Sequence, residues 1–431
     1  MSHRASRQLN VNGLARVEGE GALHVTVRDG VVERVAMRIY EPPRFFEAFL
    51  RGRKYTEPPD ITARICGICP VAYQLSACNA LEAVCGVEVS GQLAELRRLL
   101  YCGEWISSHA LHIYLLHAPD FLGYPDAITL AKDHREIVER GLALKKAGNA
   151  ILELVGGRAI HPVNVRLGGF YRAPTRAELA PLAERLRGAV DDAIETARWV
   201  STFDFPDLEL DHELLALHEP DRYAIESGVP RTASGVSWPL ADYSTHVVEE
   251  QVPHSTALHA RLDGQPFLTG PLARYAVGSA NLSPTARQVA AETGLGPVCR
   301  NPFRSIMVRA VELVYAVDEA LRLIEAYEPL SPSFVDVPAR PGVGHGATEA
   351  PRGTLYHRYE LDEQGLITSA VIVPPTAQNQ AAIEDDLARL VQDNLTLDDH
   401  ALTHLCEQAI RNYDPCISCS AHFLELTVDR Q

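Results

Sequence analysis

Two short cysteine motifs near opposite ends of the chain are the residues best suited to metal or redox chemistry. The first motif is Cys66–Cys69 and the second is Cys416–Cys419, each with two residues between its cysteines. A Cys-x-x-Cys segment directs two sulfurs toward one point, so two such segments brought together form a site with four thiolate ligands. Because hundreds of residues separate the motifs, the whole fold would have to close such a site.

The spacing of the cysteines leaves more than one kind of site open. A structural zinc site with four cysteine ligands is one alternative. Zinc ribbons, however, usually place the second pair about 15–20 residues after the first. A redox dithiol is another alternative, and it predicts one Cys-x-x-Cys opening a helix in a thioredoxin-like βαβ unit. The residues around the two motifs must separate these possibilities.

The composition narrows the classes of partner. The chain has 431 residues, of which 46% are hydrophobic and 22% charged, as expected for a globular protein with a large core. A formal net charge of −16 without a Lys/Arg-rich block argues against nucleic acid and anionic membrane surfaces as partners. No apolar run reaches about 18 residues and Met1–Asn10 has no leader pattern, so we expect neither a membrane span nor an export signal.

The other cysteines are scattered. An odd total of nine in a long chain favours reduced thiols in the cytoplasm. We interpret the five outside the motifs as small core residues, too dispersed to hold an iron–sulfur cluster. They are Cys78, Cys85, Cys102, Cys299 and Cys406.

Hydrophobic periodicity predicts an α+β architecture that brings the motifs together. Gly19–Tyr40 and Gly353–Pro374 alternate as β-hairpins, with turns near Asp29 and Asp362. The segments between them have mostly helical spacing. The helices that we predict are Leu93–His117, Arg176–Val200, Ser305–Tyr327, Gln380–Asp393 and Leu397–Asn412. We therefore expect a bundle of long helices, with antiparallel hairpins from both ends of the chain pairing to bring the cysteines together.

The sequence around the cysteines resembles the large, catalytic subunit of nickel–iron hydrogenases. The motifs are Arg64-x-Cys66-Gly67-x-Cys69 and Asp414-Pro415-Cys416-x-x-Cys419-x-x-His422. Further segments resemble the same family in the same order. They are Arg16–Gly19, Arg44–Glu47, Ser108–His112, Gly270–Arg274, Thr348–Gly353 and Pro375–Asn379. The Pro43–Ala48 segment and the Tyr413–Ser420 ending are most similar to the cytoplasmic NAD(P)-linked branch, which includes sulfhydrogenases.

The resemblance implies a nickel–iron centre on the four cysteines. Cys66, Cys69, Cys416 and Cys419 would all bind nickel, and Cys69 and Cys419 would also bridge to an iron that carries carbonyl and cyanide ligands. Thiolates are the soft ligands that suit these metals. Arg352 would lie near the open site, where its guanidinium offsets the negative charge and hydrogen-bonds a cyanide. The alternative for Arg352 is a surface turn.

Two carboxylates would support this centre. Glu18 resembles the family's proton-relay glutamate, which hydrogen-bonds a nickel thiolate and passes protons from heterolytic H2 cleavage. The alternative is a structural salt bridge between Glu18 and Arg16. Asp414 matches a carboxylate that positions groups around the metals, and its alternative is an ordinary Asp-Pro turn.

The resemblance also implies a buried magnesium site. Glu47 and His422 match its side-chain ligands, and the backbone carbonyl of Ile372 would complete it. His109 and His112 lie three residues apart on a predicted helix. We interpret both as packed or hydrogen-bonded histidines rather than metal ligands.

Two residues differ from the family pattern. Tyr73 stands where many relatives carry a histidine that tunes a bridging sulfur, and a phenol cannot become cationic near pH 7. Ser108 stands where membrane-bound relatives carry aspartate, which agrees with the cytoplasmic branch.

The sequence thus predicts a catalytic subunit that cleaves H2 reversibly and passes electrons to an iron–sulfur small subunit, then to flavin- and NAD(P)-binding subunits. The alternatives are a hydrogen sensor, a non-catalytic relative without turnover, or a structural zinc protein. The resemblance further implies a maturation protease and nickel-insertion proteins as partners. We expect residues 1–422 to form one domain, and residues 423–431 to be a C-terminal extension that is removed on maturation; an ordinary terminal strand is the alternative for this extension.

Overall fold

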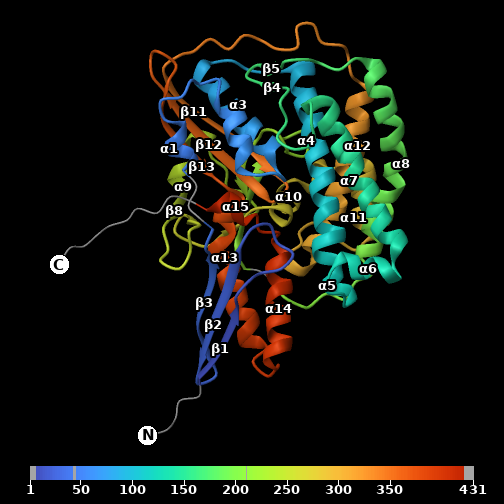
Figure 1. Cartoon of the computed structure of the whole chain (residues 1–431), viewed down its shortest axis with the longest axis vertical. Coiled ribbons are helices and arrows are strands. Elements are labelled where there is room, and N and C mark those ends of the chain that lie inside the picture. Colours follow the sequence, from blue (N-terminus) through green and yellow to red (C-terminus); the bar gives the residue numbers. More distant parts are fainter. Residues whose placement is uncertain (1–5, 42–44, 210, 422–431) are drawn as a thin grey trace, which may run out of the picture.

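Four long helices form one side of the molecule (Figure 1). They are α4 (Gly91–Leu111), α7 (Arg135–Gly156), α8 (Arg176–Val200) and α12 (Ser305–Glu325). In this computed structural model, which describes residues 6–41, 45–209 and 211–421, α4 packs on α7 and α12, and α8 packs on α7 and α12. Three of the four were predicted, whereas α7 was not. The segment predicted to extend α4 continues as a π-helical turn, His112–His117.

Two three-stranded antiparallel sheets include the predicted hairpins. The first consists of β1 (Ser6–Val11), β2 (Gly21–Arg28) and β3 (Val31–Ile39), and the second has the order β11-β12-β13. The strands of the second sheet are β11 (Gly342–Ala350), β12 (Gly353–Leu361) and β13 (Ile367–Val373). The β2–β3 turn falls at Asp29-Gly30, both with positive φ, as the Asp-Gly signal predicts.

The two hairpins do not pair with each other, which corrects our expectation. They belong to separate sheets. The N-terminal region instead pairs with the C-terminal cysteine motif through one isolated parallel bridge, between Glu18 and Cys416. The N-terminal motif instead reaches the second sheet through α3 (Pro70–Cys85), which packs on β11 and β12. The C-terminal motif follows α14 (Asp399–Asn412) and opens the short helix α15 (Ile417–Ser420).

Helix α13 (Pro375–Asp393) connects these parts, because it contacts β3, β9 (His259–Leu262), α14 and α15. The remaining helices are α1 (Phe46–Leu50), α2 (Pro58–Thr62), α5 (Ala118–Leu122), α6 (Ala127–Asp133), α9 (Tyr243–His246), α10 (Pro271–Gly278) and α11 (Pro284–Glu292). The remaining strands are β4 (Val165–Arg166), β5 (Gly169–Phe170), β6 (Glu213–His218), β7 (Val229–Thr232), β8 (Val247–Glu250), β9 (His259–Leu262) and β10 (Phe267–Leu268).

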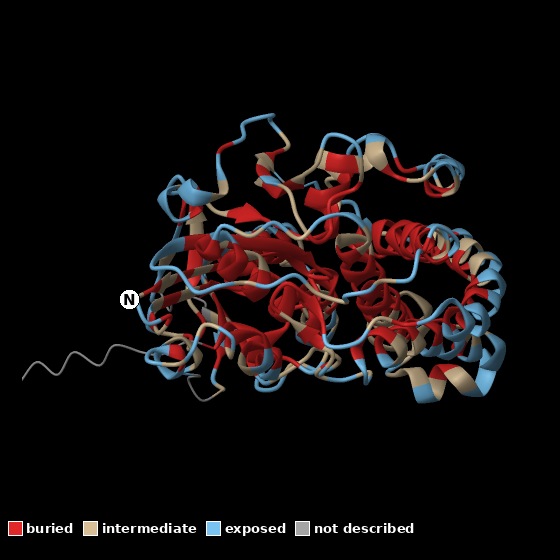
Figure 2. Ribbon diagram, turned by 90° about the horizontal axis from the view of Figure 1, so that it is seen from above, coloured by how far each residue is buried: buried red, intermediate tan, exposed pale blue. Residues whose placement is uncertain are grey.

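One large hydrophobic cluster joins the helix bundle to both sheets, and a smaller cluster lies around β6–β9. Figure 2 shows the buried residues running from the sheets into the facing sides of the bundle helices, with exposed residues on their outer sides. The apolar residues that recur at helical spacing along α12 form a buried stripe, which includes Met307, Val311 and Val314. The four motif cysteines belong to the large cluster. Among the helices described, none has the length and apolar character needed to cross a membrane.

Candidate metal centre

The four motif cysteines meet at one buried point. Their sulfurs all lie within 4.8 Å of one another. The Cys66–Cys416, Cys69–Cys419 and Cys416–Cys419 Sγ distances are 3.4, 4.0 and 2.9 Å. These are too long for a disulfide, which is about 2.0 Å. Two thiolates bound tetrahedrally to one metal at about 2.3 Å lie about 3.8 Å apart, so the spacing fits a metal site.

Charge also favours a metal. Hydrogen bonding from Cys416 lowers the pKa of Cys66, whereas burial raises the pKa of Cys419. Buried thiols this close cannot all ionise without a compensating cation. Two divalent metals would supply that compensation and allow four thiolates. The donor set therefore fits a soft metal centre.

The N-terminal pair is held at the start of α3. Cys69 is the residue before the helix and Pro70 is its first residue, a favourable position for proline. Glu104 of α4 accepts hydrogen bonds from the backbone N–H groups of Val71 and Ala72, at 2.7 and 3.2 Å. Burial raises the pKa of Glu104. Sequence reasoning missed Glu104, because its partners lie on another helix and no local motif marks it.

The C-terminal pair is positioned by α13 and by a strained residue. The Cys416 N–H donates to Thr376 Oγ1 at 3.0 Å, and Thr376 lies in the first turn of α13. Asp414 has φ 50°, in the left-handed region that aspartate tolerates better than most residues. Such strain is common at functional sites. It turns the chain so that the Asp414 side chain and carbonyl both face Arg352.

Glu18 contacts the centre directly. Its Oε2 accepts from Cys416 Sγ at 3.1 Å and from the Ser418 N–H at 3.0 Å. Gly19 has φ 90°, and a Cβ there would come within 2.9 Å of Ile417 and Ser418, which explains a glycine at this approach. Arg16 is paired with Asp120, not with Glu18, so the structural salt bridge considered for Glu18 is absent among the described residues.

Arg352 is fully buried beside the cysteines. Its Nε donates to the Asp414 carbonyl at 2.9 Å, its Nη2 to Asp414 Oδ1 at 3.1 Å, and its Nη1 lies 3.4 Å from Ser108 Oγ. Burial opposes its charge, but Asp414 and the thiols more than offset this and raise the pKa of Arg352. Arg352 is therefore not a surface turn residue. Gly270, which has φ 116° and precedes α10, lies close to the Arg352 backbone, and a Cβ there would come within 2.8 Å of the Arg352 carbonyl oxygen.

Three further aromatic or imidazole side chains lie close by. Burial lowers the pKa values of His109 and His112. His109 Nε2 lies 3.0 Å from Glu312, and His112 Nε2 donates to the Arg411 carbonyl at 2.8 Å. His112 is thus held by a hydrogen bond, and His109 is packed between the Glu312 carboxylate and the Trp105 ring, whose centroid lies 5.5 Å from its own, so both are packed or hydrogen-bonded as we interpreted them. Tyr73 is buried against the His357 ring, with centroids 5.8 Å apart.

Two of the predicted magnesium ligands lie side by side. The Ile372 N–H donates to Glu47 Oε1 at 2.7 Å, and both residues line a small cavity of about 30 Å³ together with Glu249, Cys419 and Ala421. In an antiparallel strand the N–H and C=O of one residue point to the same side, so the Ile372 carbonyl faces this region too. His422 and the extension after it lie outside the described residues.

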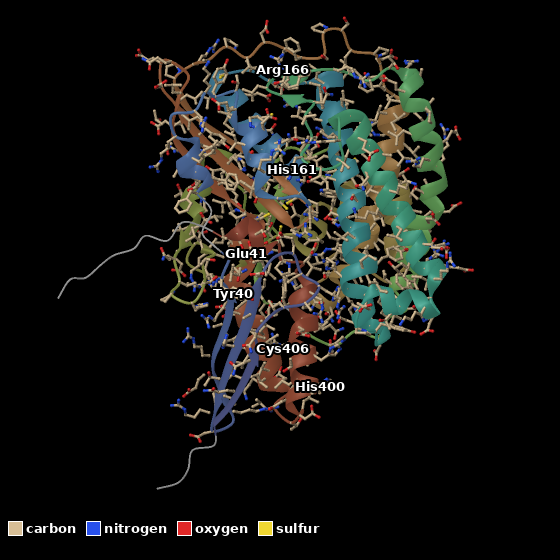
Figure 3. All side chains as sticks on the ribbon, in the orientation of Figure 1. Tyr40, Glu41, His161, Arg166, His400 and Cys406 are labelled. Atoms are coloured by element: carbon tan, nitrogen blue, oxygen red, sulfur yellow. The ribbon has the colours of Figure 1, made fainter. Side chains whose placement is uncertain are left out.

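The remaining cysteines are core residues, as predicted. All five are buried and none belongs to a metal-ligand group among the described residues, and Cys406 lies on α14 (Figure 3). Sequence reasoning also missed His161, labelled in Figure 3, whose Nδ1 lies 2.6 Å from the Ala63 carbonyl just before the first cysteine motif. Nothing in its local sequence indicates this contact.

Comparisons with known proteins agree with this geometry. A family model described as nickel-dependent hydrogenase matches residues 44–153 and 240–422. The alpha subunits of sulfhydrogenases 1 and 2 from Pyrococcus furiosus are each 33% identical to this chain. Each alignment spans 97% of this chain, together with 98% of the first relative and 100% of the second.

Solved structures share the whole fold. An NAD+-reducing NiFe-hydrogenase in the H2-reduced state aligns with a TM-score of 0.87 at 27% identity, over 96% of this chain and 99% of that one. A NiFeSe-hydrogenase of Dm. baculatum aligns with a TM-score of 0.77 at 20% identity, over 97% and 100%, and supports the fold alone. The α+β architecture predicted from the sequence is confirmed. With its paired cysteine motifs meeting at one buried point, the chain belongs to the nickel-dependent hydrogenase family.

Proposed function

We propose that the chain is the catalytic subunit of a hydrogenase that interconverts H2 with protons and electrons. The observation that carries this proposal is the group of four buried sulfurs within 4.8 Å, with the Glu18 carboxylate 3.1 Å from one of them. A structural zinc site needs four thiolates, but it does not require a carboxylate in contact with one of the ligand sulfurs. A non-catalytic relative would resemble the family without the nickel cysteines, whereas this chain has all four.

All four cysteines would hold nickel, and Cys69 and Cys419 would also hold iron with its carbonyl and cyanide ligands. When bound, this centre supplies the heterolytic cleavage of H2. The chain's own residues would stabilise the charge of this centre and transfer protons to and from it. Arg352 keeps a fixed positive charge within a buried, water-poor site, where such a charge stabilises nearby anions strongly. Asp414 fixes the orientation of that guanidinium.

Glu18 would receive the proton. Its Oε2 is within hydrogen-bonding distance of Cys416 Sγ, which is buried, while Glu18 itself is partly exposed. A carboxylate in this position can take a proton from the thiol sulfur and release it toward solvent. The Ser418 N–H keeps the acceptor oxygen aimed at the sulfur.

Electrons would leave through another polypeptide. Among the described residues, the cysteines outside the centre are dispersed through the core and cannot hold an iron–sulfur relay. We infer an iron–sulfur small subunit docked close to the centre, followed by flavin- and NAD(P)-binding subunits. The NAD+-reducing enzyme with a TM-score of 0.87 supports an NAD(P)-linked acceptor, and the sulfhydrogenase alpha subunits support the branch that the resemblance implies. A cytoplasmic location is part of the same proposal, because that branch is cytoplasmic.

Magnesium would bind in the cavity beside Glu47. The Glu47 carboxylate, the Ile372 carbonyl and His422 would be its ligands, and oxygen ligands are those that Mg²⁺ prefers. The Glu47–Ile372 contact supports the placement of the first two.

Metal analysis and infrared spectroscopy of the purified complex test the proposed function. We expect nickel and iron in equal amounts at the four cysteines, together with infrared bands from carbonyl and cyanide. Zinc in place of nickel, without those bands, would make this a structural zinc protein. A nickel–iron centre that turns over H2 only sluggishly would instead favour a hydrogen sensor.

We also predict that active enzyme ends at His422. Cys416 and Cys419 must be reachable while metal is inserted by nickel-insertion proteins, and an attached extension can keep the C-terminal segment out of the core until a protease removes residues 423–431. The structure shows the inward position of this segment, with Ala421 buried and bridged to Ala257, and this is the place that we expect the chain end to take after cleavage. Intact-mass measurement on active enzyme should give residues 1–422. Full activity with the extension attached would contradict this prediction.

A further inference from the structure

A second group of metal-ligating side chains lies apart from the cysteines, on different elements. His254 precedes β9, His259 is the first residue of β9, and Glu384 lies on α13. One ligand atom from each lies within 4.8 Å of the others. His254 Nε2 is 2.7 Å from Glu384 Oε1, and the two imidazole rings meet edge to face with centroids 5.5 Å apart.

His259 is the unusual member of this group. Its side chain is only 2% exposed, and its Nε2 has no hydrogen-bond partner within the part of the chain that the structure describes. A buried polar atom without a partner costs about 1–3 kcal/mol. Native proteins rarely leave such an atom unsatisfied unless an ion or water completes it. A bound cation near His254 and Glu384 would satisfy it.

A histidine–carboxylate pair alone would not suggest a metal. Asp386, two residues further along α13, forms such a pair with His212, whose Nε2 lies 3.0 Å from Asp386 Oδ1. That pair has no second imidazole within reach among the described residues. The group around Glu384 differs by adding the buried imidazole of His259.

We propose that His254, His259 and Glu384 form a second metal site, which binds a divalent transition-metal ion such as Zn²⁺. Two imidazoles and one carboxylate are a donor set that suits Zn²⁺, with water as the fourth ligand. Two such ligands at about 2.0–2.1 Å from one ion lie about 3.3 Å apart. The present separations, from 2.7 Å to at most 4.8 Å, bracket this value, so small side-chain rotations would complete the site.

The surroundings give the ion both access and support. His254 lines a polar surface depression of about 400 Å³, and the side chains of His254 and Glu384 are 16% and 15% exposed. An ion could enter from this side, although it would pass Arg34 and Arg38, which line the same depression. Glu384 Oε1 also accepts from the Met37 N–H at 2.7 Å, and such a bond orients a ligating carboxylate. The ion would therefore connect β9 and α13 to the N-terminal sheet.

The test uses the assembled complex with its nickel and iron in place, so that the four cysteines are not available to zinc. After dialysis against Zn²⁺ and removal of free metal, we expect one zinc per chain in addition to nickel and iron. His254→Asn and Glu384→Gln should each weaken this binding at least about tenfold. Glutamine at position 384 still accepts from the Met37 N–H, so the fold is preserved. Bound zinc should also raise the melting temperature, because it binds only the folded chain.

The matched control is His212→Asn, which removes the other histidine–carboxylate pair of α13 and should leave zinc binding unchanged. X-ray absorption at the zinc edge should show nitrogen and oxygen donors with imidazole and no sulfur. Any one of three results overturns the proposal. They are no additional zinc in the unmodified complex, zinc binding in both site variants as tight as in the unmodified complex, or a zinc ion with sulfur ligands. Equal loss in the His212→Asn control would overturn it as well. None of these readouts depends on hydrogenase activity.

Discussion

Replacing Glu18 with glutamine is expected to lower H2 turnover by about 100-fold to 10,000-fold, the range that a positioned proton-transfer group contributes. Glutamine has nearly the same shape and can still accept the Ser418 N–H, so the approach to Cys416 should survive. What it loses is the ability to take a proton from the sulfur, 3.1 Å from Glu18 Oε2. The chemistry at the metals should remain intact.

Three measurements separate this proton role from a structural one. The Glu18→Gln enzyme should hold the same nickel and iron content and show the same infrared bands as the unmodified enzyme, with only turnover reduced. Glu20→Gln is the matched control, because Glu20 lies two residues away but is exposed, and its turnover should be normal. Near-normal turnover in Glu18→Gln would reassign Glu18 to positioning the Ser418 backbone.

Much of this arrangement could be predicted from local sequence, because the contacts concerned lie within short motifs. The Asp29-Gly30 turn and the apolar stripe of α12 indicated their own elements. The two cysteine motifs predicted a group of four sulfurs, and the resemblance predicted Glu18 and Arg352 near them. The structure brings these six side chains together, whereas their roles at a metal stay predictions.

What could not be predicted depends on contacts between distant segments. Hairpin periodicity identifies strands but not their partners, and so the expected pairing of the two hairpins was wrong. Glu104 lies in the middle of a helix whose sequence pattern is that of an ordinary bundle helix. Its carboxylate nevertheless accepts hydrogen bonds from the free backbone N–H groups at the start of α3. His254, His259 and Glu384 come together only because α13 packs on β9. Their spacing along the chain follows no metal-binding motif.

The second large effect is expected at Arg352, whose fork of donors faces Asp414 and Ser108. Arg352→Lys keeps a positive charge and most of the stem, but an ammonium cannot reproduce the planar, oriented guanidinium. We expect turnover to fall by about 100-fold to 1,000-fold, the cost of losing one oriented donor in a buried site. Metal content should be retained, because no ligand has changed. Turnover within about threefold of normal would show that only the charge at this position matters.

A charge-removing series then distinguishes catalysis from stability at the same residue. Arg352→Met leaves Asp414 buried without its partner, which should destabilise the fold by about 3–5 kcal/mol. Adding Asp414→Asn removes the unpaired charge and should recover most of that stability in denaturant unfolding, whereas turnover should stay low because the positive charge is still missing. Arg97→Lys is the control for a buried arginine outside the centre, since Arg97 pairs with Glu82. It should lower stability while the folded enzyme keeps its turnover. If the Arg352→Met/Asp414→Asn enzyme regained turnover along with stability, Arg352 would be a structural residue rather than part of the chemistry at the cysteines.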